Sequence, residues 1–291
     1  MHERVHEQII IRKSENMYRI TKVLNHNAVM AVKDGTSEYL IMGKGIGFGK
    51  KISEEINPSE SDTVYSLQSE GERGSASDIV KTTDPDCLEI ADFILNNAEK
   101  KFGKVDRDII FPMADHLQYA LRRMEINEEL KNDLNDDIRI IYHEEYEIAA
   151  GSREIVKKIK GLELTDDEIG YIALHIHSAI QEENVSQAMI AAQLVRACAD
   201  AIGSRTGKKI EVRSLDYNRL INHIRYMVIR MQTGEKLKLN MNDYMIIKFP
   251  KTFAIAEDVC RKMSDLMKLP YDSAEVGYLA MHIERVGGTN I

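Results

Sequence analysis

The sequence predicts an α+β chain in which a small antiparallel β module precedes two tandem all-α helix-bundle domains. Three observations favour this architecture. Short apolar runs separated by turn signals occupy residues 17–67. The chain has 6% aromatic residues, no Trp and abundant Met, Leu, Ile and Ala, a composition that favours helices. The part after the β module also repeats itself at a fixed spacing of 107 residues.

The N-terminal part divides into residues 1–16, expected to be a flexible extension, and residues 17–70, expected to be the β module. Four runs in this module predict four short antiparallel strands: YRITKVL, AVMAV, EYLIMG and DTVYSL. The pair Asp34-Gly35 is a hairpin signal, because both residues tolerate the left-handed backbone of a tight turn. A sheet this small has little core, so we expect two copies to dimerise and bury one face.

The charge distribution sets the β module apart from the rest of the chain. The whole chain has a net charge of −8. Residues 17–51 carry six basic and two acidic side chains, a local charge of +4 that leaves −12 for the remainder. A basic module attached to an acidic body indicates an anionic partner for the module alone.

Residues 43–51, GKGIGFGKK, look like a phosphate-binding loop but fit neither nucleotide pattern. A Walker loop would need Gly at position 44, and the dinucleotide pattern GxGxxG starting at Gly43 fails at Phe48. What remains is a basic turn with backbone N–H groups and an aromatic ring that can stack on an unpaired base. Together with the amides of residues 25–27, NHN, this set suits RNA with bulges or loops. The alternative is a glycine-rich hairpin with solubilising lysines and a core Phe.

Two pairs of histidines recur at the repeat spacing: His116 with His223, and His175 with His282. A capping-box pattern that marks a helix start also recurs, with Glu168 and Glu275 as its last residues. These matches predict two homologous helical domains, residues 75–182 and 183–291. Aliphatic neighbours have drifted between the copies whereas the histidines have not, which favours a chemical role over simple packing.

Three chemistries use recurring histidines. Metal binding is disfavoured at His175 and His177, because helix positions two apart point about 200° away from each other. General acid–base catalysis would need accompanying polar groups, and we find no carboxylate partner in sequence beyond Asp115. In the third chemistry, a neutral imidazole nitrogen accepts a phosphoryl group and returns it, which adds a charge of about −1.5 to −2. A helical metal-dependent hydrolase that uses His116 and His175 is the enzyme alternative.

The segments KVLNHNAV and MGKGIGFGKK, followed by two helical domains with two histidines each, resemble the BglG/LicT-type transcriptional antiterminators of bacterial sugar phosphotransferase (PTS) operons. The resemblance extends from Met17 to the C-terminus and is closest to the GlcT-like members that control a glucose transporter operon. It implies a CAT RNA-binding domain that dimerises and binds a hairpin in nascent mRNA, which prevents formation of the terminator. The implied RNA contacts are Lys22, Asn25, Asn27, Gly43, Lys44, Gly45 and Phe48.

The resemblance also implies that the helical domains are PTS regulatory domains (PRDs) with phosphorylated histidines. These are His116 and His175 in the first PRD and His223 and His282 in the second. Enzyme II of the sugar transporter, through its EIIB domain, would phosphorylate the first PRD when sugar is absent and silence the protein. The phosphocarrier HPr would phosphorylate the second PRD and activate it. Asn222 stands where the first copy has Asp115, so the two copies can differ in donor.

We therefore expect a cytoplasmic homodimer that is not an enzyme and needs no cofactor or metal. No stretch approaches the roughly 18 apolar residues of a membrane span, and no signal-peptide core is present. Cys87, Cys198 and Cys260 are scattered, which is typical of reduced thiols. The remaining alternative among binding proteins is a PRD-containing DNA-binding regulator, although no helix-turn-helix pattern precedes residue 70.

Overall fold

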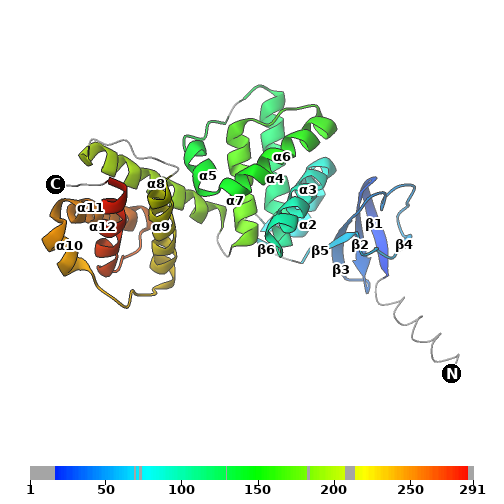
Figure 1. Cartoon of the computed structure of the whole chain (residues 1–291). Helices are drawn as coiled ribbons and strands as arrows, with labels where there is room; N and C mark the ends of the chain where they lie inside the picture. Colours follow the sequence, from blue (N-terminus) through cyan, green and yellow to red (C-terminus); the bar gives the residue numbers. More distant parts are fainter. Residues whose placement is uncertain are drawn as a thin grey trace. The chain divides into compact units, whose positions relative to one another are not determined.

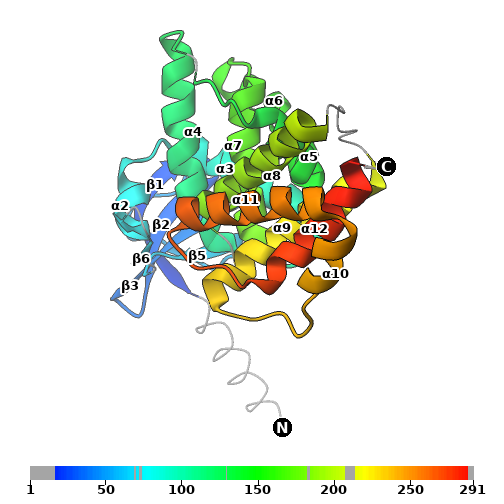
Figure 2. The same cartoon turned by 90° about the vertical axis from the view of Figure 1, so that its left-hand side faces the viewer.

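The computed structural model describes residues 17–68, 70–71, 74–128, 130–181, 184–206 and 214–287. The predicted extension, residues 1–16, lies outside this set. The chain forms two compact units, Met1–Lys131 with Glu147–Glu182 and Asn132–Tyr146 with Glu183–Ile291. The first unit contains an antiparallel sheet and helices, and the described part of the second is helical (Figures 1 and 2). The predicted α+β class is confirmed, whereas the predicted domain boundaries stay predictions.

The sheet of the first unit is antiparallel throughout, with strand order β4-β1-β2-β3-β5. Four strands lie where four runs predict them: β1 (Tyr18–Asn25), β2 (Ala28–Lys33), β3 (Ser37–Met42) and β5 (Thr63–Ser66). Asp34 and Gly35 both have positive φ, as the turn signal between β2 and β3 requires. The fifth strand, β4 (Glu55–Ile56), has only two residues, too few to leave a periodic pattern in the sequence.

One face of this sheet carries the core of the β module. Val29 pairs with Val23 on one neighbouring strand and with Ile41 on the other, so apolar side chains from the three central strands lie side by side. The buried cluster comprises Tyr18, Ile20, Val29, Ala31, Ile41 and Ile56. A second, two-stranded sheet, β6 (Glu70–Gly71) with β7 (Gly74–Ser75), follows in the segment before the helices.

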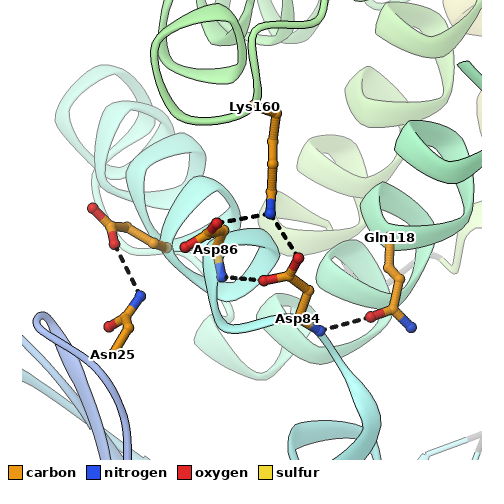
Figure 3. Close-up of polar contacts among 6 residues, drawn as sticks. Asn25, Asp84, Asp86, Gln118 and Lys160 are labelled. Atoms are coloured by element: carbon orange, nitrogen blue, oxygen red, sulfur yellow. Dashed lines mark hydrogen bonds and ion pairs between the residues drawn. The ribbon is translucent and has the colours of Figure 1, made fainter. Parts of the chain in front are cut away.

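The helices of the first unit begin with α2 (Ala76–Thr82) and α3 (Pro85–Phe102). A 3-10 turn, η1 (Arg107–Ile109), leads into α4 (Ile110–Glu125), and α6 (His143–Lys160) and α7 (Asp166–Ile180) follow. The start of α3 is pinned at several points. Lys160 Nζ lies 2.6 Å from Asp84 and 2.7 Å from Asp86, and the backbone N–H of Asp84 donates to Gln118 (Figure 3). The start of α3 is therefore tied to α4 and α6.

The second unit consists, where described, of α5 (Asn135–Ile141), α8 (Val185–Thr206), α9 (Leu215–Thr233), α10 (Asn242–Lys248), α11 (Pro250–Met267) and α12 (Ala274–Gly287). Its core comes from the facing sides of α8, α9, α11 and α12, including Leu220, Met227, Val259 and Leu279. Helix α5 belongs to this unit, and directly after it the Tyr142 hydroxyl donates to the carbonyl of Ala188 in α8 at 3.1 Å. Within the residues the structure describes, no helix is long and apolar enough to cross a membrane. Cys87 and Cys260 are buried free thiols.

Candidate functional site

The predicted RNA-contact residues other than Lys22, which lies within β1, gather at one end of the sheet, where the turn of residues 25–27 meets the loop of residues 43–49. The backbone N–H of Gly45 donates to Asn27 Oδ1 at 2.8 Å, and the N–H of Asn27 donates to Asn25 Oδ1 at 2.8 Å. Both amide oxygens are thus used to hold the loop together. The loop itself therefore does not use the side-chain N–H₂ groups of the two asparagines.

Close packing explains two of the loop glycines. A Cβ atom at Gly47 would lie 2.2 Å from the carbonyl oxygen of Asn25, a backbone atom that cannot move aside. A Cβ atom at Gly43 would lie 1.7 Å from Asp62 Oδ1. Gly43 was predicted as an RNA contact and Gly47 was not. Gly47 keeps the two segments close enough for Asn27 to bridge them, whereas Gly43 makes room for Asp62.

Phe48 is 70% exposed at the tip of this loop, and its ring meets His26 edge to face at 5.4 Å. The alternative that Phe48 is a core residue is therefore wrong. Lys22 and Lys44 are also exposed. An exposed aromatic ring in a loop that also carries an exposed lysine matches the chemistry that binds unpaired nucleotides.

Asn25 and Asn27 differ from the exposed residues because a helix covers them. Their Nδ2 atoms lie 3.3 and 3.0 Å from the two carboxylate oxygens of Glu89 on α3. Figure 3 shows the first of these contacts, which is made by Asn25. One carboxylate therefore accepts a hydrogen bond from each asparagine. This contact was not predicted from the sequence.

The first histidine cluster, defined as His116, Arg123, Glu168, Tyr171 and His175, joins α4 to α7. The ring centroids of His116 and His175 are 5.4 Å apart. His116 Nε2 lies 3.1 Å from Glu168 Oε2, and Arg123 donates to Glu168 Oε1 at 2.7 Å. Burial alone would raise the pKa of Glu168, but His116 and Arg123 lower it, so this carboxylate is charged at neutral pH. A charged carboxylate facing Nε2 favours a proton on that nitrogen.

The second histidine cluster, His223, Arg230, Glu275, Tyr278 and His282, joins α9 to α12 with the same residues 107 positions later. The two histidine rings stack at 4.7 Å with 25° between their planes. Arg230 binds both oxygens of Glu275, at 2.5 and 2.9 Å, and His223 Nε2 lies 3.7 Å from the same carboxylate.

The surroundings of the second cluster keep its imidazoles neutral. Burial, the neighbouring ring of His282 and the charge of Arg230 lower the pKa of His223 to about 3. Burial also lowers the pKa of His282, helped by Arg285 and Arg219 and opposed by Asp216. A neutral imidazole retains a lone pair at physiological pH, which a phosphoryl acceptor requires.

The role of Glu168 and Glu275 corrects the sequence analysis, which treated both as capping-box residues and found no carboxylate partner beyond Asp115. Thr165 does cap α7 by accepting from the backbone N–H of Glu168. The Glu168 side chain, however, turns toward α4 rather than back to the cap, because Arg123 and His116 offer a charged partner in a buried place. Glu168 is 2% exposed and Glu275 1%.

The structure bears on the metal alternative as well. His175 and His177 are both buried in α7, at 4% and 1% exposure. Across the described part of the chain, no group of three or more His, Cys, Asp or Glu side chains is arranged to hold a metal ion.

Comparisons with known proteins agree with this architecture. The family described as CAT RNA binding domain matches residues 18–74, and the PRD domain family matches residues 88–179 and 198–286. A GlcA/glcB genes antiterminator of Staphylococcus carnosus is 29% identical over 273 residues, covering 91% of this chain and 94% of its own length. Transcription antiterminator LicT of Bacillus subtilis is 24% identical, with coverage of 92% and 98%. A crystal structure of GlcT CAT-PRDI aligns at 30% identity and a TM-score of 0.48, covering 57% of this chain and 99% of that one. The chain belongs to the BglG/LicT-type transcription antiterminators, which join a CAT RNA-binding domain to two PRD domains.

Proposed function

We propose that this protein binds a hairpin in nascent mRNA through its CAT domain and so prevents a terminator from forming in a sugar phosphotransferase operon. The polar end of the sheet is the observation that carries the proposal. Two asparagine N–H₂ groups, exposed lysines and the exposed ring of Phe48 surround one loop, which suits unpaired bases better than a plain duplex. The proposed contacts are Lys22, Asn25, Asn27, Gly43, Lys44, Gly45 and Phe48.

The RNA-binding part can be tested by comparing labelled hairpins of the same sequence made of RNA and of DNA. We expect the RNA hairpin with internal loops to bind and the DNA hairpin to bind far more weakly. Phe48→Ala should weaken RNA binding by about 1–3 kcal/mol, the usual contribution of one stacked base. Equal affinity for the DNA hairpin would favour the DNA-binding regulator. Unchanged affinity of Phe48→Ala for the RNA hairpin would refute the proposed RNA-binding surface.

The second part of the proposal is that phosphorylation of His116, His175, His223 and His282 switches the protein. The imidazole lone pair forms a bond to phosphorus while the bond between phosphorus and the donor protein breaks, its electron pair staying with the donor. The proposed donors are the EIIB domain of enzyme II for the first PRD and HPr for the second. The neutral imidazoles of the second cluster support this chemistry.

The charge added to either cluster would act on a buried carboxylate. A phosphoryl group of about −1.5 to −2 would be placed within a few ångströms of Glu168 or Glu275, where like charges repel strongly. We infer that this repulsion repacks the helix pairs, α4 with α7 and α9 with α12, and thereby changes how two protomers of a cytoplasmic homodimer associate. The protein is in this view a regulator that carries phosphoryl groups rather than an enzyme.

Radiolabelled phosphoenolpyruvate, supplied with enzyme I, HPr and EIIB, tests the second part directly. We expect label on the four histidines, with loss of the first-PRD label in a His116→Ala/His175→Ala variant. The same variant should be active without sugar in a reporter assay. Label that never reaches these side chains would refute the switch while leaving RNA binding untouched. A hydrolase activity that is lost when a chelator removes metal, with no label incorporated, would favour the hydrolase alternative.

A further inference from the structure

Helix α3 of the first unit contacts the proposed RNA-binding face through an acidic side chain. The carboxylate of Glu89 accepts hydrogen bonds from the Nδ2 atoms of Asn25 and Asn27, one to each oxygen. Because the oxygen atoms of these amides already hold the loop, their N–H₂ groups are the donors through which the two asparagines can read an RNA partner. Glu89 therefore occupies the same donors that a base edge would use.

A second contact fixes this arrangement of helix and sheet. The hydroxyl of Tyr65 on β5 donates to Asp92 at 2.5 Å, and Asp92 lies one helical turn beyond Glu89 on α3. Asn96, one turn further, donates to Asp92 at 2.8 Å, and Arg107 lies 3.6 Å from the same carboxylate. Glu89 thus belongs to a polar face of α3 that is organised along three turns.

The duplicated domain lacks this polar face. At the repeat spacing of 107 residues, the positions of Glu89, Asp92 and Asn96 are taken by Arg196, Ala199 and Gly203. The histidine clusters, by contrast, keep all five residues in both copies. The acidic face is specific to the PRD that follows the CAT domain in the chain, which a general packing role for these residues would not explain.

The chemistry of a carboxylate makes it a competitor for RNA. Its two oxygens offer acceptors to both amides at once, as acceptor atoms on base edges or phosphates would. Its negative charge also lies beside the basic loop that would neutralise an RNA backbone, so a phosphate approaching this surface meets repulsion while Glu89 is in place.

We propose that Glu89 on α3 closes the RNA-binding face, and that a hairpin binds only when the first PRD releases Asn25 and Asn27. This inference rests on the proposed RNA-binding function and adds a means of regulating it. The apparent affinity for RNA is then reduced by the fraction of molecules in the open state. A protein that is open one time in ten gains about tenfold in affinity when the closed state is removed.

The test uses the full-length, unphosphorylated chain and a fluorescent RNA hairpin selected from a randomised internal-loop pool for binding to the wild-type protein. We expect Glu89→Gln and Glu89→Ala to bind it about tenfold more tightly than wild type. Glu154→Gln is the matched control, because it removes one exposed negative charge from α6 of the same unit. It should change the affinity less than twofold. Circular dichroism melts confirm that each variant is folded.

The outcomes separate this inference from the function on which it rests. Affinity unchanged in both Glu89 variants, while Phe48→Ala still weakens binding, overturns the closure and leaves RNA binding intact. A gain of the same size in Glu154→Gln also overturns it, because general charge would then be the cause. Failure to select any hairpin, or no effect of Phe48→Ala, overturns the RNA-binding proposal itself.

Discussion

Arg230 offers the sharpest test of how the second histidine cluster is held together. Its guanidinium group binds both oxygens of Glu275, which is 1% exposed. Arg230→Met keeps much of the side-chain volume but leaves the carboxylate buried without its cation. Breaking a buried pair in this way costs about 3–5 kcal/mol of unfolding free energy, because the remaining charge stays out of water.

Two further variants show whether the cost comes from the unpaired carboxylate. In the first cluster, Arg123→Met leaves Glu168 with His116 Nε2 at 3.1 Å, so we expect a smaller loss of about 1–3 kcal/mol. Replacing both members of the second pair, Arg230→Met with Glu275→Met, removes the buried charge altogether. This double variant should recover most of the stability, because apolar side chains of similar volume replace a buried ion pair at little net cost.

The measurement must separate the two units, because a whole-chain transition would mix them. Hydrogen exchange followed by mass spectrometry does so through peptides from α9 and α12 on one side and α4 and α7 on the other. A loss of about 3–5 kcal/mol speeds globally limited exchange by roughly a hundredfold to a few thousandfold. Unchanged exchange in Arg230→Met, or a double variant as unstable as the single one, would refute the reasoning.

Three more outcomes follow from the structure. Because folding holds the pKa of His223 at about 3 instead of 6.5, only the unfolded chain takes up this proton as the pH falls below 6.5. The second unit should then lose about 1.4 kcal/mol per pH unit, seen as a falling urea midpoint, and a flat profile from pH 7 to 5 would contradict this. Gly277→Ala would place a Cβ 2.9 Å from the backbone N of Asn242, so its melting temperature should fall with a cost of about 1–3 kcal/mol, and an unchanged melt would be evidence against the close approach. Tyr65→Phe removes the 2.5 Å hydrogen bond to Asp92, so urea unfolding of the first unit should show a loss of about 1–3 kcal/mol; equal stability would show that this carboxylate finds another donor.

The sheet and its hairpin were predictable because local signals set them. Short apolar runs bounded by turn signals predict β1, β2, β3 and β5, and Asp34-Gly35 adopts the backbone that its residue types favour. Strand β4 could not be predicted, since two residues carry no period and their pairing with Tyr18 and Arg19 is set by the tertiary fold. The exposure of Phe48 could not be predicted from the local sequence either, because an aromatic ring in a glycine-rich loop can lie in a core or on a surface.

The histidine clusters show a different limit of sequence reasoning. The repeat marked His116, His175, His223 and His282 as candidate functional residues. Glu168 was not marked, because the capping-box pattern already accounted for a glutamate at that position. Thr165 does accept a hydrogen bond from the backbone N–H of Glu168, but the side chain of Glu168 binds Arg123 instead of returning to the cap. A comparison of the copies held the missing signal, because Arg and Glu recur at the same 107-residue offset as the histidines. Glu89 left no such signal, since its partners come from a strand and a loop more than sixty residues away.

The same five residues give the two clusters different electrostatic states. In the first cluster Glu168 divides its oxygens between Arg123 at 2.7 Å and His116 at 3.1 Å. In the second, Arg230 takes both oxygens of Glu275 and the histidine stands back at 3.7 Å. A carboxylate saturated by arginine stabilises a nearby imidazolium less than one that is shared with the histidine, because its charge is already neutralised. Duplication has therefore kept the five residues of the site, while the position of one guanidinium group sets whether the histidine lies 3.1 or 3.7 Å from the carboxylate.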